Sequence, residues 1–358
     1  MCIYYKDQLG LNYQKQEHII PAALGGIKTL ARGVVSDEFN REIAELEREY
    51  MRDSLFAGFS RIVQGPGVRG SLSSHRQVRS KIHVLVNKSD PSDLTLGYIQ
   101  KGIPYQLVQL RYNIQTKDVQ VQFPNSPVID VSATFNELKE ICRMVRNSKV
   151  TELFSDQIPP EVLLFGYLQE AKGPRLFFAS NADAEFKFEP EILEEFAEKL
   201  FIDPAKGISN SNPVISNTTA VFKVDYHRVH AKMAFNYLAH LYGAEFVNNT
   251  CFDAIRNWIA SGGENDFVGL NQEKDAAIQQ IVEILPPAAH AVLICHDRDH
   301  VFAYVIVYRH WVNFIVLTRN APSMPPGMMQ GLICDWKNRI EFSLSELWNI
   351  IQPNILHN

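Results

Sequence analysis

Two short stretches near the start of the chain decide the fold: residues 17–26 read EHIIPAALGG, and residues 36–40 read SDEFN. The first stretch predicts a short β-strand carrying His18, which must end in a tight turn because Pro21 and the glycine pair interrupt regular structure. The second stretch predicts the start of a helix, since serine is a favoured N-cap and two acidic residues follow it in the first turn. We expect residues 33–35 to return between them as an antiparallel strand.

The predicted helix has an apolar stripe and a polar neighbouring face. The stripe recurs at intervals of four, three and four residues: Phe39, Ile43, Leu46 and Tyr50. Asn40 falls on the neighbouring face. Two strands and one helix therefore converge, and we expect Asn40 to lie close to Glu17 and His18 where they meet.

This arrangement resembles the HNH endonuclease family, whose ββα-metal core carries an acidic residue and a histidine on the first strand and an asparagine or histidine on the helix. The EHIIPAALGG and VVSDEFN segments are most similar to the branch with an EHIIP-x-x-LGG signature. The resemblance implies hydrolysis of DNA with one divalent ion, Mg²⁺ or Mn²⁺, bound by Glu17 and Asn40, and with His18 as the general base. The residue types suit that chemistry, because carboxylate and amide oxygens are hard ligands and a neutral imidazole accepts a proton near neutral pH.

Two departures from the family pattern lie in the same module. Many relatives bind a structural zinc through two Cys-x-x-Cys pairs, but of the four corresponding positions here only Cys2 is a cysteine. One thiolate is too few for a tetrahedral zinc site, so we expect no structural zinc and instead apolar packing of Tyr5 and Phe39. The middle polar residue of the family motif has no clear counterpart in residues 27–32, where Thr29 is the nearest candidate.

A basic segment follows the module. Residues 61–81 contain no acidic residue and five lysines or arginines: Arg61, Arg69, Arg76, Arg79 and Lys81. We expect these side chains to contact the phosphate backbone of a nucleic acid beside the site. A solvated basic loop is the alternative interpretation.

Two other polar clusters are interpreted as structural. His227 and His230 lie three residues apart on a predicted helix, with Lys232 close by, but no third metal ligand stands at motif spacing. The sequence CHDRDH at residues 295–300 falls where a hairpin turn is expected, between the first two strands of a predicted antiparallel meander. We therefore expect packing or partner contacts at the first cluster and a polar turn at the second.

Composition limits the class of protein. The chain has 358 residues, of which 46% are hydrophobic and 21% charged, as in globular proteins long enough for two or more domains. No apolar run approaches the ~20 residues of a membrane span, and the first residues lack the pattern of a signal peptide. Five scattered cysteines argue against a disulfide framework and predict a cytoplasmic location. The net charge of −5 means that any basic surface must be local.

We therefore expect an α+β protein with a ββα nuclease module at residues 1–60, a basic connector at residues 61–81, and an α+β domain for recognition, regulation or oligomerisation at residues 82–358. The predicted function is that of a metal-dependent DNA endonuclease, with RNA as an open alternative target and a role in antiviral defence by analogy. The alternative function is a nucleic-acid- or ligand-binding sensor with an inactive ββα module. No membrane partner is expected, and double-strand cutting by one site per chain would suit a homodimer.

Overall fold

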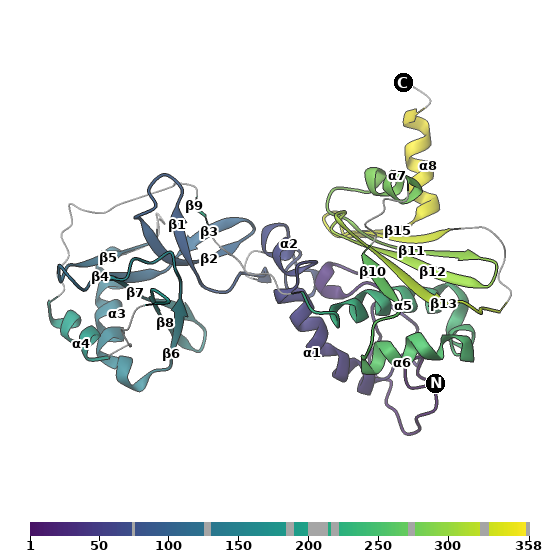
Figure 1. The fold of residues 1–358 in the computed structure, drawn as a ribbon, viewed down its shortest axis with the longest axis horizontal. Helices are drawn as coiled ribbons and strands as arrows, with labels where there is room; N and C mark the ends of the chain where they lie inside the picture. Colours follow the sequence, from purple (N-terminus) through teal and green to yellow (C-terminus); the bar gives the residue numbers. More distant parts are fainter. Residues whose placement is uncertain are drawn as a thin grey trace. The chain divides into compact units, whose positions relative to one another are not determined.

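The structure is a computed structural model with an α+β fold (Figure 1). It describes residues 1–73, 76–124, 130–183, 190–199, 214–215, 222–270, 276–322 and 329–355. The chain forms two compact units: unit 1 is Met1–Val78 with Ala220–Asn358, and unit 2 is Arg79–Thr219.

The N-terminal module of unit 1 is a short hairpin followed by a long helix. His18 pairs with Thr29 in an antiparallel bridge, and the Ile19 N–H donates to the Lys28 carbonyl at 3.0 Å. The segment that pairs with the first strand of the hairpin is therefore the one around Thr29. The expectation that residues 33–35 would form this antiparallel partner is wrong.

A tight turn explains this difference. A short 3₁₀-helix, η1 (Ala22–Leu24), ends at Gly25 in the left-handed conformation with φ 96°. Gly26 lies so close to Ile20 that a Cβ on Gly26 would be 1.8 Å from the Ile20 carbonyl oxygen. Because the chain reverses within these few residues, pairing begins directly after the glycine pair.

Helix α1 (Asp37–Asp53) begins and packs as predicted. The Ser36 hydroxyl accepts a hydrogen bond from the Phe39 N–H at 3.3 Å, with two acidic residues in the first turn. The expected stripe faces the core: Phe39, Ile43 and Tyr50 are buried, and the partly buried Leu46 packs beside them.

Helix α5 (Tyr226–Val247) is the centre of unit 1. Between Tyr226 and Ala239, every residue except Arg228 is buried, and a helix surrounded in this way lies inside a core. One hydrophobic cluster joins α5 to the N-terminal module on one side and to a β-sheet on the other. The helix bends at Gly243, where φ is 86°.

The sheet of unit 1 is antiparallel, in the order β10-β13-β12-β11-β14-β15. Its strands are β10 (Val268–Leu270), β11 (His290–Asp297), β12 (His300–Val307), β13 (Trp311–Thr318), β14 (Gln330–Asp335) and β15 (Ile340–Ser343). The predicted meander is confirmed by the pairing of β11 with β12 and of β12 with β13. Helices α5 and α6 (Asp253–Ser261) lie on one side, and α7 (Ala276–Ile284) and α8 (Leu344–Ile355) cover the other (Figure 1).

Within its described residues, unit 2 has two sheets, in the orders β3-β2-β1-β9 and β5-β4-β7-β8-β6, two α-helices and a short 3₁₀-helix, η4 (Val145–Asn147). Its strands are β1 (His83–Asn87), β2 (Leu94–Gln100), β3 (Ile103–Gln106), β4 (Val108–Asn113), β5 (Val119–Gln122), β6 (Val150–Phe154), β7 (Val162–Glu170), β8 (Gly173–Ser180) and β9 (Val214–Ile215). Helices α3 (Val131–Met144) and α4 (Pro190–Lys199) share a core with the five-stranded sheet. A second core lies between the two sheets.

These units differ from the expected segments at residues 1–60, 61–81 and 82–358. The reason is that the N-terminal module shares its core with α5, so that the chain leaves unit 1 for unit 2 and then returns. The basic segment belongs partly to each unit.

Candidate functional site

Two of the predicted site residues each have a polar atom in need of a partner. His18 Nδ1 and Asn40 Oδ1 are both buried, and neither has a hydrogen-bond partner among the described residues. His18 comes from the hairpin and Asn40 from the first turn of α1. Buried polar atoms are nearly always satisfied in native structures, so such orphans call for a ligand, water or ion.

The third predicted site residue, Glu17, already forms an ion pair with a cationic side chain. The Lys232 ammonium of α5 donates to Glu17 Oε1 and, at 2.7 Å, to Glu47 Oε1 of α1. Lys232 is 2% exposed, and the side chains of Glu17 and Glu47 are 15% and 23% exposed. Burial acts to lower the pKa of Lys232, but the two carboxylates outweigh it, and the pKa is raised above its usual value.

The strand that carries Glu17 and His18 is fixed to α5 by a second contact. Asn236 Nδ2 donates to the His18 carbonyl at 3.0 Å, and Asn236 Oδ1 accepts from the Tyr4 hydroxyl at 2.6 Å. One turn of α5 thus holds the main chain of His18 next to the Lys232 ion pair.

The pair of ligands expected for Mg²⁺ or Mn²⁺ does not fit such an ion in this fold. Asn40 offers an amide oxygen without a partner, which suits a hard cation. Glu17, however, gives its carboxylate to an ammonium group that occupies the place of a positive ion. Within the described parts of the chain, no group of three or more His, Cys, Asp or Glu residues could hold a metal ion.

Tyr5 and Phe39 stand at two of the positions where many HNH proteins have zinc-binding cysteines, and aromatic rings pack together there. The ring of Tyr5 meets Phe39 edge to face at 5.7 Å, and Tyr4 stacks on Phe39 at 3.8 Å. Cys2 Sγ accepts a hydrogen bond from the Ser36 N–H at 3.4 Å. The predicted apolar packing of Tyr5 and Phe39 is therefore confirmed.

Arg61 does not belong to a phosphate-binding surface, and that expectation is corrected. It lies in α2 (Gly58–Val63) and is 5% exposed. Its guanidinium donates to the carbonyl oxygens of Ala23, Met51 and Gly67 at 3.1, 2.8 and 3.4 Å. Burial lowers the pKa of Arg61, although a guanidinium keeps its charge at any ordinary pH. The side chain thus ties three segments together.

The remaining four basic residues are exposed but lie in different units. Arg69 and Arg76 belong to unit 1, whereas Arg79 and Lys81 belong to unit 2. Arg79 forms an ion pair with Glu170, and its guanidinium lies 5.6 Å from the centre of the Tyr98 ring. Phosphate contact by these four residues stays a prediction.

The turn of the hairpin meets two other turns, and we name residues 22–26, 65–71 and 336–339 together the loop cluster. Arg339 Nη2 donates to the Gly70 carbonyl at 3.5 Å. A Cβ on Gly25 would lie 2.4 Å from the Trp336 Cβ, and one on Gly70 would lie 3.1 Å from the Ala22 carbonyl oxygen. These turns therefore pack directly against one another.

The loop cluster presents basic side chains that come from both ends of the sequence. Arg69, Lys337 and Arg339 are exposed on it, and Arg76 is close by, since a Cβ on Gly67 would be 2.4 Å from the Arg76 carbonyl oxygen. The two acidic residues flanking the third turn are engaged: Asp335 accepts from Asn338, and Glu341 accepts from the Ile27 and Lys28 N–H groups.

Sequence reasoning missed Lys337 and Arg339 because roughly 260 residues separate them from the basic segment. The available signal was local: both lie in a short turn between two strands, WKNR at residues 336–339. A turn exposes its side chains, but nothing in the sequence says beside which segment it packs.

The two other polar clusters lie where they were expected, one packed on a helix and one in a hairpin turn. His227 and His230 are buried among aromatic rings, and His230 Nε2 bonds to the Tyr50 hydroxyl at 2.7 Å. The 295–300 segment is the end of the β11–β12 hairpin, where Asp297 pairs with His300.

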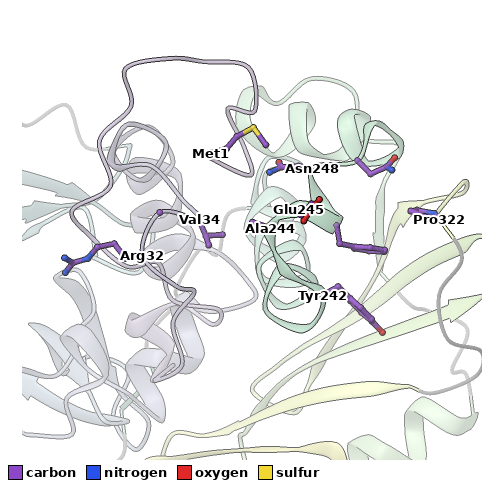
Figure 2. Close-up of a pocket in the computed structure, with 11 residues that line it drawn as sticks. Met1, Arg32, Val34, Tyr242, Ala244, Glu245, Asn248 and Pro322 are labelled. Carbon is purple, nitrogen blue, oxygen red and sulfur yellow. The ribbon is translucent and has the colours of Figure 1, made fainter.

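One pocket of about 810 Å³ lies near the bend of α5 (Figure 2). Asn248 lines it, and its buried Oδ1 has no hydrogen-bond partner among the residues described. The charged residues of the lining are Arg32 and Glu245. The others are Met1, Gly33, Val34, Tyr242, Ala244, Phe246, Asn249 and Pro322.

Comparison with known proteins identifies no relative: no family model, curated protein or solved structure matches the chain. None of the helices in the described residues is both long and apolar enough to cross a membrane.

Proposed function

We propose that this protein binds nucleic acid through the loop cluster beside its ββα module. The observation that carries the proposal is the group of exposed basic side chains on that cluster, Arg69, Lys337 and Arg339, with Arg76 next to them. These four cations outnumber the two carboxylates that flank the third turn, Asp335 and Glu341, and a local excess of positive charge attracts a phosphate backbone even when the whole chain is acidic.

The packing of the cluster supports the proposal further. Arg61 fixes the first two turns from inside the fold through Ala23 and Gly67, and the third turn packs on the first where Trp336 meets Gly25. The cations therefore lie on turns that are held in place. Cations held in place lose less conformational entropy on binding than cations on a loose loop.

The test is binding of the purified chain to labelled DNA duplex and single-stranded RNA at several salt concentrations. The proposal predicts binding that weakens steeply with salt, because each phosphate contact releases condensed counterions. Absence of binding to both nucleic acids at low salt would contradict it.

Phosphodiester cleavage at the ββα module is the second candidate function. It is favoured by the two orphaned atoms, His18 Nδ1 and Asn40 Oδ1, since a histidine without a partner can accept a proton from an attacking water molecule. The ion pair at Glu17 opposes it, because that carboxylate is already neutralised by Lys232.

A cleavage assay separates the two candidates. Wild type and His18→Ala are incubated with plasmid DNA and with RNA, in Mg²⁺, in Mn²⁺ and in EDTA. If the site is catalytic, His18→Ala lowers the rate by about 10²–10⁴-fold without lowering affinity. Equal cleavage rates in the two proteins would show that His18 is not catalytic and would leave binding as the supported function.

A further inference from the structure

We propose that the Lys232 ammonium is the resident cation of the ββα module and keeps divalent metal ions away from Glu17. The ammonium reaches between a hairpin residue, Glu17, and a helix residue, Glu47, and contacts a carboxylate oxygen of each. This inference concerns ion binding and does not rest on the proposed nucleic-acid function.

The position of the ammonium is fixed by contacts on either side of it along α5. Two residues before Lys232, His230 bonds to the Tyr50 hydroxyl of α1 at 2.7 Å. Four residues after it, Asn236 bonds to the His18 carbonyl at 3.0 Å. The helix is therefore tied to both halves of the module, and it cannot rotate to carry Lys232 away without breaking these contacts.

Burial makes the ion pair hard to exchange. Lys232 is 2% exposed, and removing one member of a buried ion pair leaves an uncompensated charge in a poorly solvated place. A divalent ion at Glu17 would have to displace the ammonium and leave it without a carboxylate. The wild-type fold therefore disfavours metal at this carboxylate.

Removal of the ammonium should reverse this preference. Lys232→Ala leaves the carboxylates of Glu17 and Glu47, both mostly buried, facing the space that the lysine filled. Two carboxylates without a cation attract a hard divalent ion, and Mn²⁺ takes such oxygen ligands. The variant should thus contain a metal site that the wild type lacks.

The experiment titrates Mn²⁺ into the full chain and counts bound ions by electron paramagnetic resonance. Five proteins are compared: wild type, Glu17→Gln, Lys232→Ala, Lys232→Ala with Glu17→Gln, and Lys232→Arg. Lys232→Arg is the matched control, because it changes the side chain but keeps the charge. Thermal unfolding of each protein is recorded with and without 1 mM Mn²⁺, a concentration of about ten times the dissociation constant expected of a weak two-carboxylate site.

We expect Lys232→Ala to gain one Mn²⁺ site that Glu17→Gln removes, and its Tm to rise by about 3–5 °C with Mn²⁺. If Lys232→Ala is unfolded without metal, recovery of a folding transition in Mn²⁺ is the equivalent result. Wild type and Lys232→Arg should show no site that depends on Glu17. A Glu17-dependent Mn²⁺ site in wild type would overturn the proposal, and so would a Lys232→Ala variant that neither gains a site nor responds to Mn²⁺ in its unfolding.

Discussion

At the residue scale, Arg61 and Lys232 are two of the buried cations that hold the N-terminal module in place, and each uses a different kind of partner. Arg61 satisfies three main-chain carbonyls that the turns leave open, whereas Lys232 is matched by two carboxylates. The sequence alone placed Arg61 in a basic segment, because residues 61–81 contain five lysines or arginines and no acidic residue. Which of several arginines turns inward depends on tertiary packing, and no local pattern encodes it.

The structural role of Arg61 gives a prediction about stability. Arg61→Met removes the donors of three buried carbonyls, and we expect the free energy of unfolding to fall by about 3 kcal/mol. Affinity of the folded variant for nucleic acid should change by less than about twofold, since the side chain is inside the fold. Urea unfolding and a binding titration measure the two effects. Unchanged stability together with lost affinity would show that Arg61 contacts nucleic acid and is not a structural residue.

Buried histidines give a prediction about pH. Burial lowers the pKa of His227 and, aided by the nearby His227, lowers that of His230 well below its usual value; it lowers the pKa of His290 to about 3. These rings stay neutral in the fold, whereas in the unfolded chain they bind protons below a pH of about 6.5. Stability contributed by the neutral rings is therefore complete above that pH and is lost as the pH falls.

Each such ring should lower the free energy of unfolding by up to about 1.4 kcal/mol per pH unit below 6.5. Urea unfolding at pH 7.5, 6.5 and 5.5 measures the slope, and His290→Gln should make it shallower. A slope that is the same with and without His290 would show that this ring does not contribute.

At the scale of elements, the sequence predicted correctly those features that depend on residues close together in the chain. The N-cap at Ser36, the stripe of α1 and the meander of β11 to β13 each depend on neighbouring residues, and each is confirmed. The return of the hairpin was misplaced because it depends on the exact path of the turn at Gly25 and Gly26. The docking of α5 on the module could not be predicted, since it joins residues about 200 positions apart in sequence.

The hairpin turn gives a prediction at this scale. In Gly26→Ala the new methyl group would collide with the Ile20 carbonyl, which cannot retreat without opening the turn, and we expect a loss of at least about 2 kcal/mol. Gly269→Ala is the matched control, because a Cβ there meets nothing within 4 Å. Thermal or urea unfolding of both variants checks this. Equal stabilities would mean that the turn at Gly26 is not as tight as described.

At the scale of the whole molecule, the order of segments in sequence is not their order in space. The core of the N-terminal module is completed by α5, so residues 1–78 alone lack the partners of Tyr4, Tyr50 and Glu17. Residues 79–219, in contrast, form a continuous unit with its own cores. The sequence suggested a boundary near residue 81. Only the contacts reveal that the core of the first segment is completed by α5, which begins at residue 226.

This organisation predicts how fragments behave. A fragment of residues 79–219 should unfold cooperatively on heating, whereas residues 1–78 should remain unfolded because their apolar stripe has nothing to pack against. Circular dichroism during a thermal scan distinguishes the two. A cooperative transition in the 1–78 fragment would contradict the shared core.

The central claim, that the loop cluster binds nucleic acid, is tested most directly by the salt dependence of DNA binding. We compare wild type with Arg69→Gln/Arg339→Gln, and use Lys88→Gln/Lys172→Gln, which removes two exposed charges from unit 2, as the matched control. The first pair should weaken binding to every sequence alike and lower the slope of log K against log salt by about two. The control pair should keep the wild-type slope. Identical slopes in wild type and Arg69→Gln/Arg339→Gln would contradict the account.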